Sequence, residues 1–430
     1  MKGGKYMTIY TVRSGDSIFS IASRYGVSSQ SIIEANGLTN QDNLVIGQAI
    51  IVPSPGNTVY MILPGDSLYT IARKYGITVE SILSANPSIT NPELIYAGEM
   101  IRIPIQNKLG TIIVNGYAYT NITNETLNNT LPYLTFISPF SYEVRRDGSL
   151  TQMQDNSVIQ TARANGVEPL MVITNIDGDN GFSSELAEAI LTNDSIQDRL
   201  IDNIIATMQT KNYYGVTVDF EYIYPRNRDD YTAFLQELAD RVNPLGYILV
   251  VTVAPKTSGT QEGLLYEAHD YGAIGTIADY VIIMTYEWGY TYGPPLPVAP
   301  ANEVERVLRY ATSVIPTQKI LMGMPNYGYD WRLPYQQGTA ARVVSNSEAV
   351  DLAFRVGAQI MYDQTAEAPY FNYYAEGAEH IVWFDDARSI NARLRFINQY
   401  NLGGASYWTI NRFFRPNWTV LDSLYDVRKL

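Results

Sequence analysis

The chain has 430 residues, which is long enough for more than one domain and for a large core. Hydrophobic residues make up 46% of it and charged residues 17%, as is usual for a soluble globular protein. The formal net charge of −13 disfavours binding to nucleic acid or to an anionic membrane surface, so we expect neither partner.

The sequence offers few residues for metal or thiol chemistry. It has no cysteine, which excludes disulfides, zinc–thiolate sites and a cysteine nucleophile. Its two histidines, His269 and His380, lie far apart, which argues against a Ser-His-Asp triad or a multi-histidine metal site. We therefore expect no metal and no cofactor. We also expect a monomer.

We expect neither a targeting signal nor a membrane-spanning segment in this sequence. The start, MKGGKYMTIYTVRSGD, has neither an apolar h-region nor a small-residue cleavage site, so we expect no secretory signal peptide. No run of about 18 apolar residues occurs, so we expect no transmembrane helix.

The first hundred residues contain an internal repeat. The repeated motifs are Gly15-Asp16-Ser17 with Gly65-Asp66-Ser67, Tyr25-Gly26 with Tyr75-Gly76, and Ala35-Asn36 with Ala85-Asn86. Each unit is predicted to run strand, helix, helix, strand. The Asp-Ser pair is a good N-cap for the first helix, and the glycine after the tyrosine is a good C-cap.

These units resemble LysM domains over residues 8–53 and 58–104, in the GDS turn, the Tyr-Gly pair, the asparagine and the closing strand that ends in proline. The resemblance implies binding of glycans that contain N-acetylglucosamine, such as peptidoglycan or chitin. It places the sugar between the loop after the first strand and the loop before the last. The residues it implies are Gly15, Asp16, Ser17, Ile18, Leu44 and Ile46, and Gly65, Asp66, Ser67, Leu68, Leu94 and Tyr96.

From residue 109 onward, apolar strand-like runs alternate with amphipathic helical stretches. Eight such units over residues 109–430 predict an α/β fold, a (β/α)8 TIM barrel. A small α+β insertion is expected at about 332–386, between the seventh strand and its helix. The predicted strands are 111–119, 134–142, 170–176, 215–222, 248–254, 280–288, 320–327 and 405–410.

The fourth predicted strand carries two carboxylates at its end, in Tyr214-Gly-Val-Thr-Val-Asp-Phe-Glu-Tyr222. Alternation along a strand puts Thr217, Asp219 and Glu221 on one face. Two acids on an apolar strand are costly to bury, so they are either catalytic or part of an ion pair or helix caps. Other predicted strand ends also carry acids and aromatic residues, and in a barrel these ends meet at one mouth. That composition is typical of a carbohydrate site.

This region resembles family-18 glycoside hydrolases, the chitinase-like group. Their DGxDxDxE motif aligns with residues 214–221, and their MxYD motif with Met284-Thr285-Tyr286-Glu287. Their eighth-strand tryptophan appears as Trp408, and Gly323–Trp331 fits their seventh strand. With the tandem LysM units, the whole resembles the spore cortex-lytic N-acetylglucosaminidases of spore-forming bacilli. This implies hydrolysis of cortex peptidoglycan in germination and residence in the spore.

The resemblance also implies a mechanism. Glu221 protonates the leaving glycosidic oxygen, and the substrate's own 2-acetamido carbonyl attacks C1, with retention of configuration. Asp219 orients the acetamido N–H, Tyr286 donates to the acetamido oxygen, and Trp408 forms the floor of the site. Further substrate contacts are expected from Glu287, Asn326, Tyr327, Trp288 and Thr217.

The sequence departs from the family pattern behind Asp219. Tyr214 and Thr217 stand where the family has its first two aspartates. A threonine can still hydrogen-bond Asp219 but cannot share its charge, and we expect a changed pH profile rather than inactivity because Glu221 is present. Two alternatives stay open: a chitinase or chito-oligosaccharide hydrolase with the same mechanism, and a non-catalytic glycan-binding protein.

Overall fold

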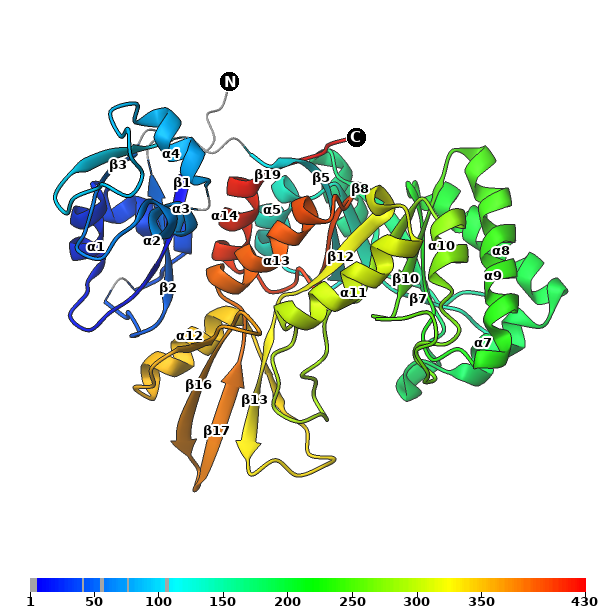
Figure 1. Ribbon diagram of the computed structural model, residues 1–430. Helices are drawn as coiled ribbons and strands as arrows, with labels where there is room; N and C mark the ends of the chain where they lie inside the picture. Colours follow the sequence, from blue (N-terminus) through cyan, green and yellow to red (C-terminus); the bar gives the residue numbers. More distant parts are fainter. Residues whose placement is uncertain (1–5, 41, 55–57, 76, 105–107) are drawn as a thin grey trace.

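The computed structural model describes residues 6–40, 42–54, 58–75, 77–104 and 108–430. Its centre is a closed barrel of eight parallel strands in the order β18-β12-β11-β10-β9-β8-β6-β5, closed by pairing of β18 with β5 (Figure 1). The barrel strands are β5 (Gly110–Tyr119), β6 (Phe136–Phe140), β8 (Glu168–Thr174), β9 (Gly215–Asp219), β10 (Ile248–Val253), β11 (Tyr280–Ile283), β12 (Ile320–Pro325) and β18 (Gly404–Trp408). The short β7 (Tyr142–Glu143) pairs with β8, and β19 (Tyr425–Val427) pairs with β5.

Helices cover the outside of this barrel. They are α5 (Asn124–Thr130), α6 (Asn156–Ala164), α7 (Ser184–Leu191), α8 (Asp194–Lys211), α9 (Arg228–Val242), α10 (Tyr271–Ile277), α11 (Ala301–Val314), α13 (Ala387–Gln399) and α14 (Arg415–Leu424). Short 3-10 turns are η1 (Leu131–Tyr133), η2 (Gly178–Asn180), η3 (Pro225–Asn227), η4 (Asn243–Leu245) and η5 (Thr317–Lys319).

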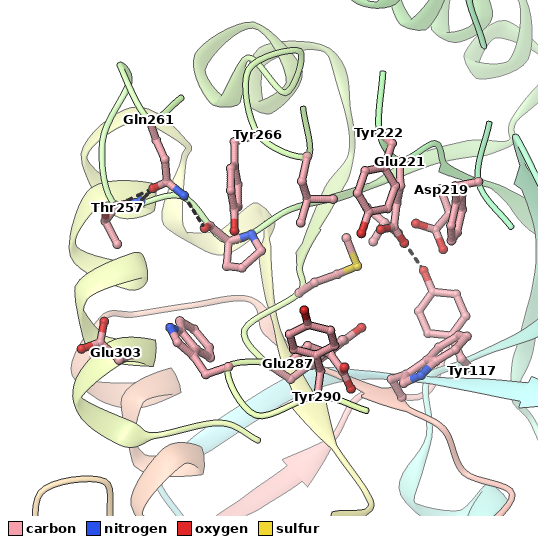
Figure 2. Close-up of a pocket in the computed structure, with 18 of the residues that line it drawn as sticks. Tyr117, Asp219, Glu221, Tyr222, Thr257, Gln261, Tyr266, Glu287, Tyr290 and Glu303 are labelled. Atoms are coloured by element: carbon pink, nitrogen blue, oxygen red, sulfur yellow. Dashed lines mark hydrogen bonds between the residues drawn. The ribbon is translucent and has the colours of Figure 1, made fainter. Parts of the chain in front are cut away.

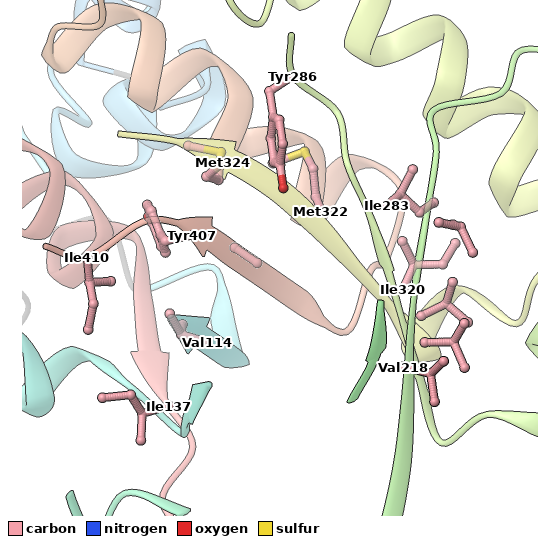
Figure 3. Packing of buried hydrophobic residues seen from close by; sticks show 14 of the residues in the cluster. Val114, Ile137, Val218, Ile283, Tyr286, Ile320, Met322, Met324, Tyr407 and Ile410 are labelled. Carbon is pink, nitrogen blue, oxygen red and sulfur yellow. The ribbon is translucent and has the colours of Figure 1, made fainter. Parts of the chain in front are cut away.

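The core has two layers because strand side chains alternate in direction. Val216 and Val218 of β9 belong to the larger layer, between the strands and the helices (Figure 3). Val172 of β8 and Val250 of β10 pack in a separate cluster that fills the barrel interior. Thr217 and Asp219 alternate with the outward valines, so they point into the barrel, toward its mouth.

The insertion follows β12 as a small antiparallel sheet in the order β14-β13-β17-β16-β15, with one helix. It begins at Gly328, close to the barrel rim. In Figure 1 its hairpin extends away from the barrel. Its elements are β13 (Gly328–Leu333), β14 (Arg342–Val344), α12 (Asn346–Arg355), β15 (Met361–Asp363), β16 (Ala368–Ala375) and β17 (Ala378–Trp383).

Each N-terminal repeat forms strand, helix, helix, strand with its own antiparallel strand pair. Ser17 caps the first helix in a capping box, and Gly26 ends it with φ 65°. Asn36 explains the repeated asparagine, because its amide donates to Ile51 O and its Oδ1 accepts from Ile51 N, which ties helix to strand. The elements are β1 (Tyr6–Thr11), α1 (Ile18–Tyr25), α2 (Ser29–Asn36), β2 (Ala49–Ser54), β3 (Thr58–Met61), α3 (Leu68–Tyr75), α4 (Val79–Ala85) and β4 (Met100–Ile103).

The predicted fold class is confirmed: a TIM barrel with a small α+β insertion, preceded by two βααβ units. Among the residues that the structure describes, no helix is both long and apolar enough to cross a membrane.

Candidate active site

A cavity of about 920 Å³ opens at the C-terminal ends of the barrel strands (Figure 2). Carboxylates and aromatic rings dominate its wall, as expected from the strand ends in the sequence. The lining residues with acidic or aromatic side chains are Tyr117, Tyr119, Phe140, Phe182, Asp219, Glu221, Tyr222, Tyr266, Tyr286, Glu287, Trp288, Tyr290, Glu303 and Trp408.

Asp219 is the last residue of β9, and Glu221 follows just beyond the strand. The buried valines and Phe220 anchor the strand from its outer side, which leaves both carboxylates on the cavity side. Figure 2 shows the two side chains next to each other in the cavity wall. The spacing of two residues therefore does what the sequence predicted, and brings both acids to one place.

Asn175, a residue without an assigned role in the sequence, fixes the backbone that carries Glu221. Its Nδ2 donates to Glu221 O at 2.9 Å, and its Oδ1 accepts from Glu221 N at 2.9 Å. The amide also donates to Ser183 O at 3.0 Å. In the sequence, the signal for this role was an asparagine at the end of a predicted strand. That signal is weak, because asparagines are common in loops and caps.

Burial and two neighbouring carboxylates favour protonation of Glu221. Burial, followed by the negative charges of Asp219 and Glu287, raises the pKa of Glu221 well above its usual value. Burial also raises the pKa of Asp219. A carboxyl group that stays protonated near neutral pH can act as a general acid.

Thr217 does not do what the sequence suggested. Its hydroxyl and Asp219 Oδ1 are both buried, and neither has a hydrogen-bond partner among the described residues. The hydrogen bond that a threonine could make to Asp219 is therefore not formed here. Both side chains point into the barrel, but two strand positions on one face are too far apart for a short threonine to reach the next carboxylate. Asp219 instead has Thr174 as its register partner on β8.

Tyr286 and Trp408 line the cavity as predicted. Burial raises the pKa of the Tyr286 phenol, which keeps its hydroxyl protonated as a donor. Trp408 packs edge-on against Phe140 at 4.8 Å and against Tyr117 at 5.4 Å between ring centroids, which fixes its ring in the floor.

Tyr117 is a second site residue without an assigned role in the sequence. It is buried in β5 and lines the cavity. Its hydroxyl shares a hydrogen bond of 2.7 Å with Thr252 Oγ1 (Figure 2). The charges of Asp219 and Glu221, together with burial, raise the pKa of Tyr117. Its signal was only a tyrosine near a strand end, which the sequence offers many times.

Glu287 is held by two tyrosines, one just after β12 and one in β13 of the insertion. Tyr327 donates to its Oε1, and Tyr329 donates to the same oxygen at 3.0 Å. Burial raises the pKa of Glu287, while these two hydrogen bonds oppose the rise. Glu287 lines the cavity, but Tyr327 does not. Tyr327 therefore lies behind Glu287 and supports its carboxylate, and a direct contact of Tyr327 with substrate stays a prediction.

Asn326 is also placed differently from the expectation. It is buried and outside the cavity wall, and its amide donates to Thr409 O at 3.0 Å and to Arg412 O at 2.5 Å. These bonds tie the end of β12 to the loop after β18, so Asn326 holds the floor in place. Trp288, in contrast, lines the cavity and is half-buried.

The two histidines take structural positions. His269 is buried, accepts from Ala254 N at 3.0 Å through Nδ1, and pairs its Nε2 with Phe220 O at 3.0 Å. Burial lowers the pKa of His269 to about 4, so it stays neutral. Within the described ranges, no group of three or more histidine or acidic side chains is placed to hold a metal ion.

Several of the residues predicted in the LysM loops stabilise the fold of their own module. The side chains of Ile18 and Leu68 pack in the cores of their own modules, and the part of these two residues in glycan binding stays a prediction. Asp16 accepts from Tyr10 OH at 2.6 Å and Arg13 N at 2.8 Å, and it pairs with Arg24 at 3.2 Å. In the second repeat, Asp66 likewise accepts from a tyrosine hydroxyl at 2.6 Å. These aspartates hold the turn.

Comparison with known proteins agrees with this geometry. The family model "Glycosyl hydrolases family 18" matches residues 95–412, and the LysM domain model matches residues 10–53 and 60–104. The cortical fragment-lytic enzyme of Bacillus cereus is 42% identical over 427 residues, which cover 98% of this chain and 99% of that protein.

Two further relatives have a similar length or structure. The putative sporulation-specific glycosylase YdhD of Bacillus subtilis is 37% identical over 99% of this chain and 100% of its own. The crystal structure of the Bacillus cereus spore cortex-lytic enzyme SleL superposes with a TM-score of 0.89 at 39% identity, covering 99% of both chains. The chain therefore belongs to the glycosyl hydrolases of family 18, and it is a glycoside hydrolase with two LysM domains before its catalytic barrel.

Proposed function

We propose that this enzyme is a retaining β-N-acetylglucosaminidase that acts on spore-cortex peptidoglycan during germination, and that it resides in the spore. The placement of Glu221 and Asp219 side by side at the barrel mouth, with Tyr286 and Trp408 in the same cavity, is the observation that carries the chemistry. The substrate class follows from relatives named as cortical fragment-lytic and spore cortex-lytic enzymes.

The first step needs an acid on the leaving oxygen. Glu221 protonates the glycosidic oxygen, and its raised pKa favours the protonated form that this step requires. The 2-acetamido oxygen of the same sugar attacks C1, the C1–O bond breaks, and an oxazolinium ion forms. Asp219 accepts from the acetamido N–H and balances the positive charge. Tyr286 donates to the acetamido oxygen and orients it.

The second step reverses the role of Glu221. As a carboxylate, Glu221 removes a proton from water, and the water oxygen attacks C1 from the face that the leaving group vacated. The ring of the oxazolinium ion opens and restores the acetamido group. Two inversions at C1 give net retention. Trp408 offers an apolar surface to the sugar in both steps.

The LysM pair is proposed to hold the enzyme on its polymeric substrate, as the family-model match supports. Glycan is the partner that this chemistry requires. The barrel supplies catalysis, and the repeats raise the effective concentration of the cavity at the glycan.

Replacing the acid tests the mechanism directly. We expect Glu221→Gln to reduce hydrolysis of cortex fragments by at least about 10³-fold, since the acid and base roles are both lost. Glu237→Gln, on the outer helix α9, is the matched control and should retain activity. Wild-type rates in Glu221→Gln would overturn the proposal. Early product anomers read by NMR should be β, and an α product would exclude retention.

Parallel digests of purified cortex fragments and chitin oligomers test the substrate. Mass spectrometry of the new reducing ends should identify N-acetylglucosamine ends in the cortex digest. Preferential cleavage of chitin oligomers would instead make the enzyme a chito-oligosaccharide hydrolase with the same mechanism.

A further inference from the structure

The two LysM repeats expose the same loop to different surroundings. Val45 and Tyr96 occupy equivalent positions, because each backbone N–H donates to the side chain three residues later, at 3.0 and 3.1 Å. Yet the exposed fraction of Val45 is 4%, whereas that of Tyr96 is 62%. The loop before the last strand is thus partly covered in the first repeat, where Val45 is buried although Ile46 is 42% exposed, and it is open in the second.

The insertion sheet covers the loop of the first repeat. Val45 packs into the insertion's own hydrophobic cluster with Val344 and Phe371. Ile360 N donates to Ile46 O at 2.9 Å. A Cβ on Gly47 would lie 1.8 Å from Ile360 O, so the two backbones are in direct contact there. No atom lies within 4 Å of a Cβ built on the equivalent Gly98.

The strand that follows the loop repeats the contrast. Ala49 and Ile51 of β2 join the core cluster of the catalytic barrel, and β2 packs on α13. Their counterparts in β4, Met100 and Arg102, are exposed. Figure 1 shows the first repeat, in dark blue, beside α14. The first repeat therefore carries an apolar docking face in its sequence, and the second does not.

Polar contacts fasten the same interface. Thr419 Oγ1 of α14 donates to Ala35 O at 2.7 Å, and Nη2 of the Arg388 guanidinium donates to Gly47 O at 3.1 Å. Arg388 is itself held by Asp386 at 2.6 Å. Such paired groups around a buried apolar centre are the anatomy of a stable interface.

The second repeat instead presents an apolar and aromatic surface, the Tyr96 patch, formed by Leu63, Leu94 and Tyr96. All three side chains are exposed. The two loops that carry them are joined, because Gly98 N donates to Ile62 O and Ile62 N donates to Glu99 O, both at 2.8 Å. The corresponding positions of the first repeat are Arg13, Asn43 and the buried Val45. An exposed tyrosine with aliphatic neighbours suits the apolar face of a pyranose ring.

We propose that the two repeats have separate tasks. The first is a docking element that forms one body with the barrel and the insertion. The second carries the glycan-binding surface, at the Tyr96 patch, for a chain of N-acetylated sugars. This inference rests on the proposed glycan substrate, and assigns polymer retention to one repeat instead of two.

Co-sedimentation of the full chain with insoluble, sodium dodecyl sulfate-washed cortex peptidoglycan tests the assignment. Tyr96→Ala should weaken the apparent Kd about tenfold, because it removes the aromatic surface of the patch. Phe19→Ala is the matched control, since Phe19 is an exposed aromatic residue of the first repeat, 75% exposed. It should change the apparent Kd less than twofold. Circular dichroism verifies that both variants are folded.

The outcomes separate this inference from the proposed function. Equal retention of Tyr96→Ala and the wild type overturns the assignment, and so does an equal loss in Phe19→Ala and Tyr96→Ala. Hydrolysis is measured independently, with the wild type on soluble cortex fragments. A wild type that sediments in a Tyr96-dependent way but releases no reducing ends would overturn the proposed activity and support the assignment of the second repeat.

Discussion

The side-chain amide of Asn175 forms two hydrogen bonds of 2.9 Å with the backbone of Glu221, one to the carbonyl oxygen of Glu221 and one from its N–H. This pairing resembles the contact between two neighbouring strands, and it extends the order of β9 past its last residue, Asp219. The position of the catalytic acid thus depends on a side chain that directly follows the neighbouring strand β8. A small shift of a general acid reduces its efficiency, since proton transfer needs hydrogen-bonding distance.

Replacing Asn175 should therefore affect turnover more than binding. We expect Asn175→Ala to lower kcat about 10- to 100-fold with KM changed less than threefold, because the acid is misplaced while the sugar contacts remain. Steady-state kinetics on soluble fragments measures the split. Asn165→Ala is the control, since the side-chain amide of Asn165 donates to Thr161 O on the protein surface. A rise in KM with unchanged kcat would show that Asn175 acts in binding.

Glu287 should set the alkaline limit of activity. Its negative charge raises the pKa of Glu221, so Glu287→Gln should lower that pKa. Glu221 must be protonated to act as an acid. Its protonated fraction would then fall at a lower pH, and the alkaline limb of kcat/KM should move toward acidic pH. A pH–rate profile beside Glu237→Gln measures the shift. An unmoved limb, or one displaced toward alkaline pH, would contradict the electrostatic role.

The unpartnered hydroxyl of Thr217 predicts an unusual response of stability. Thr217→Val keeps the shape and removes a buried polar atom without a described partner, so it should stabilise the fold by up to about 1 kcal/mol. Thr252→Val is the matched comparison on β10. It removes the bond to Tyr117 and should destabilise by about 1 kcal/mol. Chemical denaturation of both variants measures the sign of each change in the free energy of unfolding. Destabilisation by Thr217→Val would mean that its hydroxyl has a partner after all.

The sequence predicted the barrel, the repeats and the convergence of Asp219, Glu221, Tyr286 and Trp408 on one mouth. These follow from local pattern: hydrophobic alternation, caps, and the rule that strand ends meet in a barrel. Glu287 also lines the cavity as expected.

What the sequence did not predict depends on which chain segments meet. Asn326 and Tyr327 follow the end of a barrel strand, as several residues of the cavity wall do. The Asn326 amide, however, donates to the loop after β18, and the Tyr327 hydroxyl donates to Glu287. Asn175 reads as an ordinary loop residue until its partner is known. The sequence contained one sign that the first repeat docks, since it has Val45 where the second repeat has Tyr96. Only the insertion's position explains it.

The docking interface predicts a difference between two equivalent glycines. Gly47 and Gly98 both have left-handed backbones, with φ of 87° and 95°, so an alanine at either costs about 1–2 kcal/mol from backbone strain. At Gly47 the new Cβ would also meet Ile360 O at 1.8 Å, which forces the first repeat away from the insertion. Gly98→Ala meets no atom within 4 Å. We therefore expect Gly47→Ala to lower the unfolding midpoint clearly more than Gly98→Ala.

Limited proteolysis provides a second measurement of the same pair. Undocking exposes the apolar faces of Ala49 and Ile51, so Gly47→Ala should be cut faster between the repeats and the barrel. The Gly98→Ala variant should be cut at the wild-type rate there, because its strain is confined to an exposed loop. Equal destabilisation and equal cleavage of the two variants would show that the contact with Ile360 contributes nothing beyond backbone strain. A larger effect for Gly47→Ala would show that the contact between the Gly47 loop of the first repeat and the insertion contributes to the free energy of docking.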